Sequence, residues 1–253
     1  MNDAKFLTRV LEKGEKVFLS PGRTHPWEDV ILGVPVSRAG GRVDRIPAVG
    51  PNTWRSMKLR TDVPIPRGPK ELFNGFFLAN ARRLREWLAS VATRDELHEF
   101  LNGICVEIRR ELRKAVEPDR LESYYRIRKP VDLYMEHLVA MATEFSAEDR
   151  RRLVPLLFLP IHKEMIKGIP TPQGTVELFD REFLRELGLT KQSAYGHIKT
   201  ERMYLAFHAE VARKAEAVSE LCGRPFHPVY FDLFWNQRYK AQGENLVELN
   251  PVR

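Results

Sequence analysis

The sequence predicts a mainly α-helical protein with an irregular, short-stranded subdomain at its N-terminus, and two observations support this. Prolines and glycines recur through residues 1–70 with short apolar pieces between them, which is typical of turns and short strands. From Pro69 onward, apolar residues recur with the period of an amphipathic helix. We therefore expect two units, a Pro/Gly-rich N-terminal subdomain at residues 1–70 and a helical body at residues 71–253.

The helical body is expected to begin with two amphipathic helices. Apolar residues at helical spacing mark the first between positions 72 and 88 and the second between positions 97 and 112. Thr93, with Glu96 three residues later, forms a capping-box pattern at the start of the second helix.

A lysine directly before a proline is the most informative local feature of the body. A short helix is expected at 119–125, followed by a tight basic connection at 126–128 and a long apolar helix that Pro130 opens. Lys129 is therefore expected at the mouth of this helix, where unpaired N–H groups and the helix dipole make the potential positive. An ammonium group held there, beside apolar surface, should lose part of its preference for the charged form, which prepares an amine nucleophile.

Three more helices and a short terminal element complete the expected body. Ser146 and Asp180 are expected to cap two of the helices, the second of which ends at Gly188. The third is a long helix at about 191–221, and an aromatic element follows at 230–235.

Composition and charge favour an anionic partner. The chain of 253 residues carries 41 basic and 34 acidic side chains, for a net charge of +7, which points first to nucleic acid. The two cysteines, Cys105 and Cys222, are far apart and neither belongs to a CxxC motif, which speaks against a zinc site and fits a reducing compartment. We expect a monomer in the cytoplasm or nucleoid, with no membrane association, metal or cofactor.

A short helix, a basic connection and a second helix together form a helix-hairpin-helix arrangement around residues 121–141. Such hairpins present backbone N–H groups and basic side chains to a phosphate backbone. In this arrangement Arg126 and Arg128 would bind DNA phosphates, while Lys129 would point to the nucleotide. The plainer alternative is that Lys129 is a solvated residue before a proline.

Three stretches together resemble the archaeal 8-oxoguanine DNA glycosylases, which belong to the helix-hairpin-helix glycosylase superfamily. They are Lys129 with its helix, the apolar run at 153–161 and the aromatic terminus at 223–235, and the resemblance extends over roughly residues 95–245. It implies a glycosylase-like helical fold and a DNA-repair enzyme that flips a damaged purine, such as 8-oxoguanine, out of the duplex and excises it. It also implies hydrolase and lyase chemistry through a lysine Schiff base.

The resemblance assigns a role to three residues. Lys129 matches the nucleophile of the family, and Asp232 and Trp235 match the residues of its base pocket. The carboxylate would accept base N–H groups and the indole would stack on the base. An N-cap aspartate and a core tryptophan are the plainer alternatives for these two residues.

The family's catalytic aspartate has two candidate counterparts in this chain. Counted from Lys129, the equivalent position after Ile161 is His162, which would act as a neutral base or an imidazolium. Asp180 can take the carboxylate role unchanged and lies before a helix, as the family's aspartate does, but requires an insertion. The sequence leaves both open, and a plain helix cap is the alternative role of Asp180.

Two other functions deserve comparison. Residues 183–199 resemble a helix-turn-helix of a non-enzymatic DNA-binding regulator, in which Lys191, Gln192, Tyr195 and Lys199 would face the major groove. A nuclease of the restriction type needs an acidic residue two positions before a lysine on a strand, and the one such triplet is 3–5, in a helical pattern. The nuclease is therefore the least favoured of the three.

Overall fold

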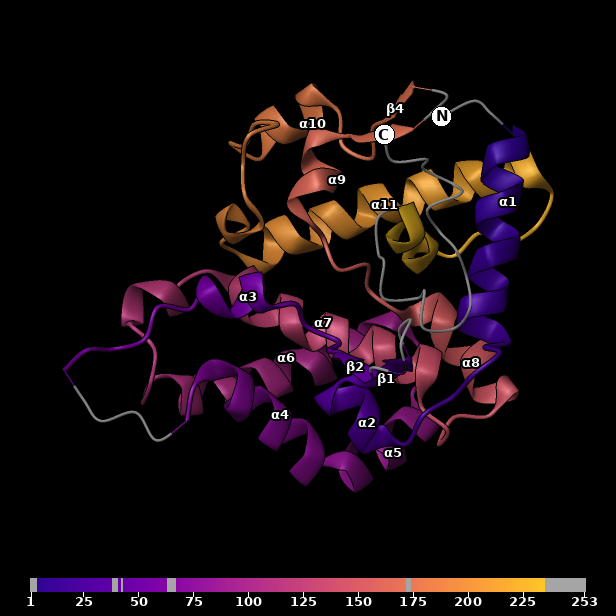
Figure 1. Ribbon diagram of the computed structural model, residues 1–253. Coiled ribbons are helices and arrows are strands. Elements are labelled where there is room, and N and C mark those ends of the chain that lie inside the picture. Colours follow the sequence, from indigo (N-terminus) through magenta and orange to yellow (C-terminus); the bar gives the residue numbers. More distant parts are fainter. Residues whose placement is uncertain (1–3, 38–40, 42, 63–66, 172–173, 235–253) are drawn as a thin grey trace.

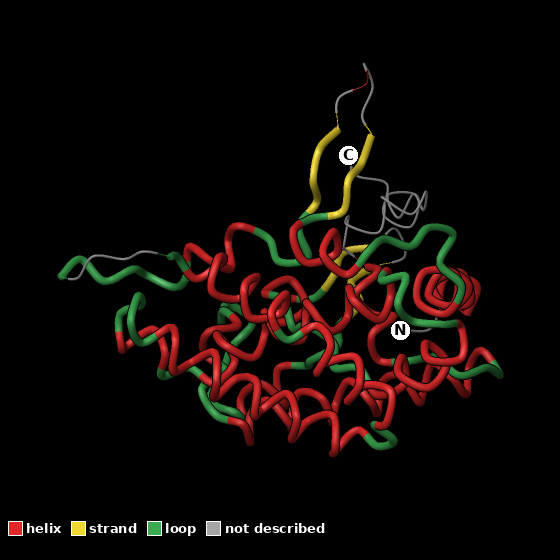
Figure 2. The backbone as a smooth tube through the Cα atoms, turned by 90° about the horizontal axis from the view of Figure 1, so that it is seen from below, coloured by secondary structure: helices red, strands yellow, loops and turns green. Residues whose placement is uncertain are grey.

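A computed structural model of the chain describes residues 4–37, 41, 43–62, 67–171 and 174–234. The described residues are mainly helical, which confirms the mainly α part of the predicted fold class (Figure 1). Helices make up the bulk of the molecule, and one strand pair extends outward from them (Figure 2). None of the described helices is long and apolar enough to cross a membrane.

The elements follow one another in an order dominated by short and medium helices. The α-helices are α1 (Ala4–Gly14), α2 (Trp27–Leu32), α3 (Pro51–Arg55), α4 (Pro69–Ala79), α5 (Ala81–Ser90), α6 (Arg94–Leu112), α7 (Tyr124–Met141), α8 (Ala147–Leu153), α9 (Lys163–Lys167), α10 (Arg181–Glu186) and α11 (Glu201–Cys222). A π-helix, η1 (Glu15–Leu19), and the 3-10 helices η3 (Pro118–Leu121), η4 (Val154–Leu156), η5 (Tyr195–His197) and η6 (Pro228–Phe234) lie between them.

The strands form two antiparallel pairs. β1 (Val34–Ser37) pairs with β2 (Val43–Ile46), and β3 (Ile169–Thr171) pairs with β4 (Gly174–Val176). The first pair lies in the Pro/Gly-rich segment, where short strands are expected. That segment also contributes α1, which packs against α11 and η6, so its first helix is part of the packing of the helical body. The boundary at residue 70 stays a prediction.

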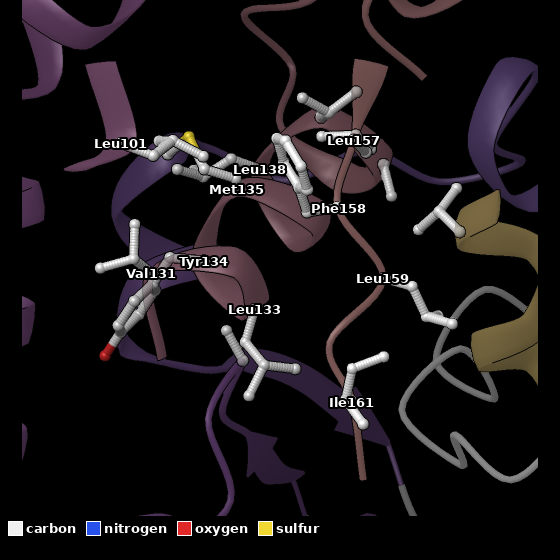
Figure 3. Packing of buried hydrophobic residues seen from close by; sticks show 14 of the residues in the cluster. Leu101, Val131, Leu133, Tyr134, Met135, Leu138, Leu157, Phe158, Leu159 and Ile161 are labelled. Atoms are coloured by element: carbon white, nitrogen blue, oxygen red, sulfur yellow. The ribbon is translucent and has the colours of Figure 1, made fainter. Parts of the chain in front are cut away.

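Helix α7 is the centre of the molecule. It lies between α6 and α2 on one side and α11 on the other (Figure 1), and every residue from Ile127 to Met141 is buried. Leu133 and Leu138 pack near the extended run 157–161 in Figure 3. Each such leucine, once fully buried, stabilises the fold by about 1.5–3 kcal/mol. The side chains that α7 carries are therefore held on a rigid element.

The start of α7 differs from the prediction. The helix begins at Tyr124 rather than at Pro130, which lies inside it. The reason is tertiary: the N–H groups of Tyr124 and Tyr125 donate to the carbonyls of Lys199 and Ile198, at 3.0 and 3.2 Å. These bonds satisfy the first turn upstream of the proline, and Pro130 then removes only one backbone hydrogen bond within the helix.

The segment that supplies those carbonyls also differs from the prediction. The long helix expected from position 191 begins at Glu201, where the Thr200 hydroxyl accepts the N–H of Met203 at 3.2 Å. Residues 191–200 are irregular except for η5, and the Lys191 amine donates to the Phe179 carbonyl at 2.6 Å. The irregular backbone lets this segment dock on α7 instead of continuing α11.

Candidate active site

Lys129 is buried within α7 rather than located at the mouth of the helix. The residue is 3% exposed, which excludes a freely solvated lysine. Its Nζ lies 3.3 Å from Nδ1 of His162 and 4.1 Å from the centre of the Tyr195 ring. A cation over an aromatic face is attracted by the ring quadrupole, so the ring and the imidazole together fix the position of the amine.

A cavity of about 370 Å³ opens beside this amine. Ligand sites in proteins generally occupy about 300–1,000 Å³, so the cavity has room for a small ring system. Its walls come from four parts of the chain that are distant in sequence. The lining residues are Gly50, Pro51, Asn52, Thr53, Lys129, Leu133, His162, Lys163, Glu164 and Tyr195.

His162 joins Lys129 to a buried carboxylate. It directly precedes α9, and its Nε2 lies 3.5 Å from Oδ1 of Asp232 in η6. The Asp232 side chain is fully buried and that of His162 is 18% exposed. Amine, imidazole and carboxylate therefore follow one another in a line that begins at the cavity and ends in the interior.

Of the two candidates for the family's aspartate, His162 lies next to Lys129 and Asp180 does not. Asp180 is exposed and caps α10, where its carboxylate accepts the N–H of Phe183 at 2.9 Å. This hydrogen bond lowers the pKa of Asp180, and the lysines that add to the effect are Lys214 and Lys191. Asp180 thus occupies the plain helix-cap role.

Arg128 is placed differently from the prediction. Its side chain is fully buried, with Nε 2.7 Å from Oδ1 of Asp132 and the guanidinium stacked over the Phe158 and Tyr204 rings. A buried guanidinium cannot reach a phosphate, so the expected contact of Arg128 with the DNA backbone is wrong. Arg126 is half-buried, and its Nη1 donates to the Arg120 carbonyl at 3.1 Å.

The hairpin itself also uses its polar groups internally. Its first helix is the 3-10 helix η3, and the connection falls at residues 122–123 instead of 126–128. Because the N–H groups of Tyr124 and Tyr125 are bonded to the 198–199 carbonyls, this helix start does not offer them to a phosphate. The expected phosphate contact by the hairpin is therefore not formed by these groups.

Asp232 and Trp235 were expected to line a base pocket. Asp232 faces His162 from inside η6 and is absent from the lining of the cavity, so its contacts fit a support for the imidazole better than a contact with a base. Trp235 lies outside the described residues.

The structure gives no support to the two alternative functions, the helix-turn-helix regulator and the nuclease. A recognition helix would start near Lys191, but α11 begins at Glu201, and Lys191 is tied to Glu177 by an ion pair of 3.0 Å. Asp3 of the acidic triplet lies outside the described residues. Within the part of the chain that the structure describes, no group of three His, Cys, Asp or Glu side chains could hold a metal ion.

The N-terminal wall of the cavity, residues 50–53, was not predicted from the sequence. Asn52 and Thr53 belong to α3, which a Gly-Pro pair opens, a pattern that marks a helix start but says nothing of what the helix faces. The Tyr195 hydroxyl donates to the Ser56 hydroxyl at 2.9 Å and so ties η5 to the end of α3. This hydrogen bond links two of the four parts of the chain that line the cavity.

Comparisons of the chain with protein-family models, curated proteins and solved structures found no match.

Proposed function

We propose that this protein is a DNA base-excision repair glycosylase that uses Lys129 as its nucleophile. It flips a damaged purine, such as 8-oxoguanine, out of duplex DNA and excises it, acting as a monomer in the cytoplasm or nucleoid. The observation that carries the proposal is the buried Lys129 amine, 3.3 Å from an imidazole nitrogen, at a cavity large enough for a small ring system. A buried amine next to a base is the arrangement that Schiff-base chemistry requires.

The chemistry needs only the amine and a proton acceptor. The neutral Lys129 nitrogen attacks the sugar C1′, and the C1′–N bond to the base breaks. The base leaves with the electron pair of that bond and takes up the proton that the Lys129 ammonium first gave to its acceptor. The sugar ring then opens as one proton of the attached nitrogen moves to the ring oxygen, which converts the amine adduct into a Schiff base. Elimination of the 3′-phosphate from this Schiff base gives the lyase activity, and water then releases the lysine.

The cavity walls suit a base taken out of the stack. A flipped base is bound by flat apolar or aromatic surfaces and by hydrogen bonds to its edge. Tyr195 offers an aromatic ring, and the exposed Asn52 offers an amide that can both donate and accept. Both come from elements outside α7, so the base would sit between the amine and the N-terminal wall.

The surface beside the cavity suits a phosphate backbone. A groove of about 420 Å³ on α3 shares Pro51 with the cavity, and its lining includes Trp54 with Arg55, Lys58 and Lys70. The three basic side chains are exposed, Lys58 forms an ion pair of 2.8 Å with Glu117, and Glu71 also lines the groove. Phosphate contacts from lysine and arginine supply most of the sequence-independent affinity for DNA, so this groove is the proposed path of the strand.

Borohydride trapping on a duplex that contains 8-oxoguanine tests the proposal. The native chain should form a covalent adduct with the DNA strand, and Lys129→Ala should not. Lys163→Ala is the matched control, because Lys163 lines the same cavity but is exposed, and it should keep the adduct. No adduct with the native chain, or an adduct that persists in Lys129→Ala, would refute the proposal.

A further inference from the structure

We infer that His162 is the catalytic base that accepts a proton from the Lys129 ammonium, and that Asp232 is a positioning residue that orients the imidazole for this transfer. The inference rests on the proposed function, because it concerns the activation of the same amine. It departs from a direct carboxylate–lysine contact by placing an imidazole between the two groups.

The hydrogen positions follow from the chemistry of the three groups. A lysine ammonium only donates, so its contact of 3.3 Å with Nδ1 of His162 requires a lone pair on that nitrogen. A neutral imidazole then carries its hydrogen on Nε2, which faces Oδ1 of Asp232 at 3.5 Å. This distance is at the long end for a hydrogen bond, and catalytic contacts commonly shorten when substrate binds.

Burial makes the transfer favourable in electrostatic terms. Lys129 and Asp232 are both shielded from water, at 3% and 0% exposure. Moving a proton from the ammonium to Nδ1 leaves the total charge of the three groups unchanged and carries the positive charge toward the carboxylate. In a site with little water, that shorter charge separation stabilises the imidazolium. The lysine is left as a neutral amine at the cavity.

The helix that carries the lysine also holds the imidazole in place. The N–H of Ile161, the residue before His162, donates to the hydroxyl of Tyr125 in α7. Tyr125 and Lys129 are four residues apart and thus lie on the same face of α7. One face of α7 therefore positions both the Lys129 amine and the backbone that carries His162. This holds the proton donor, Lys129, close to the proton acceptor, His162.

The proton is conserved through the reaction. It moves from Lys129 to Nδ1 of His162 before attack, and the imidazolium then gives it to the departing base. His162 ends neutral, with its Nε2 hydrogen still facing Asp232, while the lysine nitrogen is bonded to C1′. No other reagent takes part in this transfer.

The pH dependence of adduct formation tests the inference. Single-turnover trapping on a duplex with an abasic site exposes the sugar aldehyde and removes base recognition from the measurement. The native rate should rise with pH and level off once the imidazole is in its neutral, proton-accepting form. Asp232→Asn should move this bend to lower pH, because loss of the carboxylate makes the imidazole a weaker base. A purely structural role would lower the rate without moving the bend.

Chemical rescue provides an independent arm. His162→Ala should slow trapping by about 10²–10⁴-fold, the range that a general base contributes. Because His162 lines the cavity, added imidazole can reach the vacated space and should raise the rate again. His197→Ala is the control, since His197 is exposed and outside the cavity lining, and it should behave as the native chain.

The outcomes separate this inference from the proposed function. Absence of any Lys129-dependent adduct in the native chain would refute the proposed function and the inference with it. A Lys129-dependent adduct whose bend is unmoved in Asp232→Asn, or a His162→Ala rate that imidazole does not raise, would overturn the inference alone. Circular dichroism checks that each variant folds. If Asp232→Asn does not fold, the rescue of His162→Ala by imidazole tests the inference.

Discussion

Buried ionisable side chains are concentrated around α7, and two of them, Asp132 and His208, make the stability of the fold depend on pH. Burial raises the pKa of Asp132 to about 6, although the Arg128 guanidinium and the Tyr204 hydroxyl oppose the shift. Burial lowers the pKa of His208 in α11 well below its usual range, and the charges of Arg94 and Arg128 add to the effect. The two shifts act on stability in opposite directions as the pH falls.

For His208 the sign follows from proton linkage. Below about pH 6.5 the unfolded chain protonates this histidine while the folded chain keeps it neutral, so the free energy of unfolding falls as the pH falls. One such group changes stability by at most about 1.4 kcal/mol per pH unit. His208→Leu should therefore lose less stability between pH 7 and pH 5 than the native chain, measured by urea unfolding. Asp132 is present in both proteins, so its effect cancels in the comparison, and identical losses in the two proteins would contradict the assignment.

At the scale of the elements, the predictions that held rest on local signals. Thr93, Ser146 and Asp180 each cap the helix that the sequence assigned to them, because a cap depends on residues within one turn. The start of α7 and the helix expected from position 191 were wrong for one shared reason. The carbonyls of residues 198 and 199 bond the first N–H groups of α7, and no pattern within either segment contains that contact.

In the candidate site too, the sequence indicated some of the residues but not the contacts that they make. The resemblance led to His162 because, counted from Lys129, it occupies the position of the family's aspartate, directly after the apolar run at 153–161. The role of Asp232 depends on where η6 docks, and the contribution of Asn52 depends on where α3 lies. Both depend on tertiary packing, so the sequence could identify Asp232 as a candidate but not its contact with His162.

A hydrogen bond from the Ile161 N–H to the Tyr125 hydroxyl joins the run before α9 to α7. Tyr125→Phe removes the hydroxyl that accepts the Ile161 N–H and leaves that N–H buried without its acceptor, at a cost of about 1–3 kcal/mol. Since His162 follows Ile161, the trapping rate at a permissive temperature should fall as well.

Tyr134→Phe supplies the matched comparison. Tyr134 lies on the same helix, and its hydroxyl is bonded to Asn74, with neither residue in the lining of the cavity. The substitution should lower the melting temperature but leave trapping at the native rate. Equal trapping by Tyr125→Phe and Tyr134→Phe would argue against a role for this contact in placing His162.

At the scale of the whole molecule, the proposed path of the DNA strand is the groove on α3, whose lining holds the exposed Arg55, Lys58 and Lys70. Each phosphate contact contributes about 0.9 to the slope of log affinity against log salt concentration. Arg55→Ala combined with Lys70→Ala should therefore reduce the slope by up to about 1.8 and weaken binding to all sequences alike. Arg82→Ala on α5, an exposed residue outside the lining of both the cavity and the groove, is the control and should leave the slope unchanged.

The most direct test of the central claim is to locate the trapped sugar in the chain. After borohydride reduction of the reaction with an 8-oxoguanine duplex and digestion of both polymers, mass spectrometry should find the reduced deoxyribose fragment on Lys129. The nearby Lys163, which lines the same cavity, should be unmodified. A fragment found on Lys163 or on the N-terminal amine, or no modified peptide at all, would contradict the assignment of Lys129 as the nucleophile.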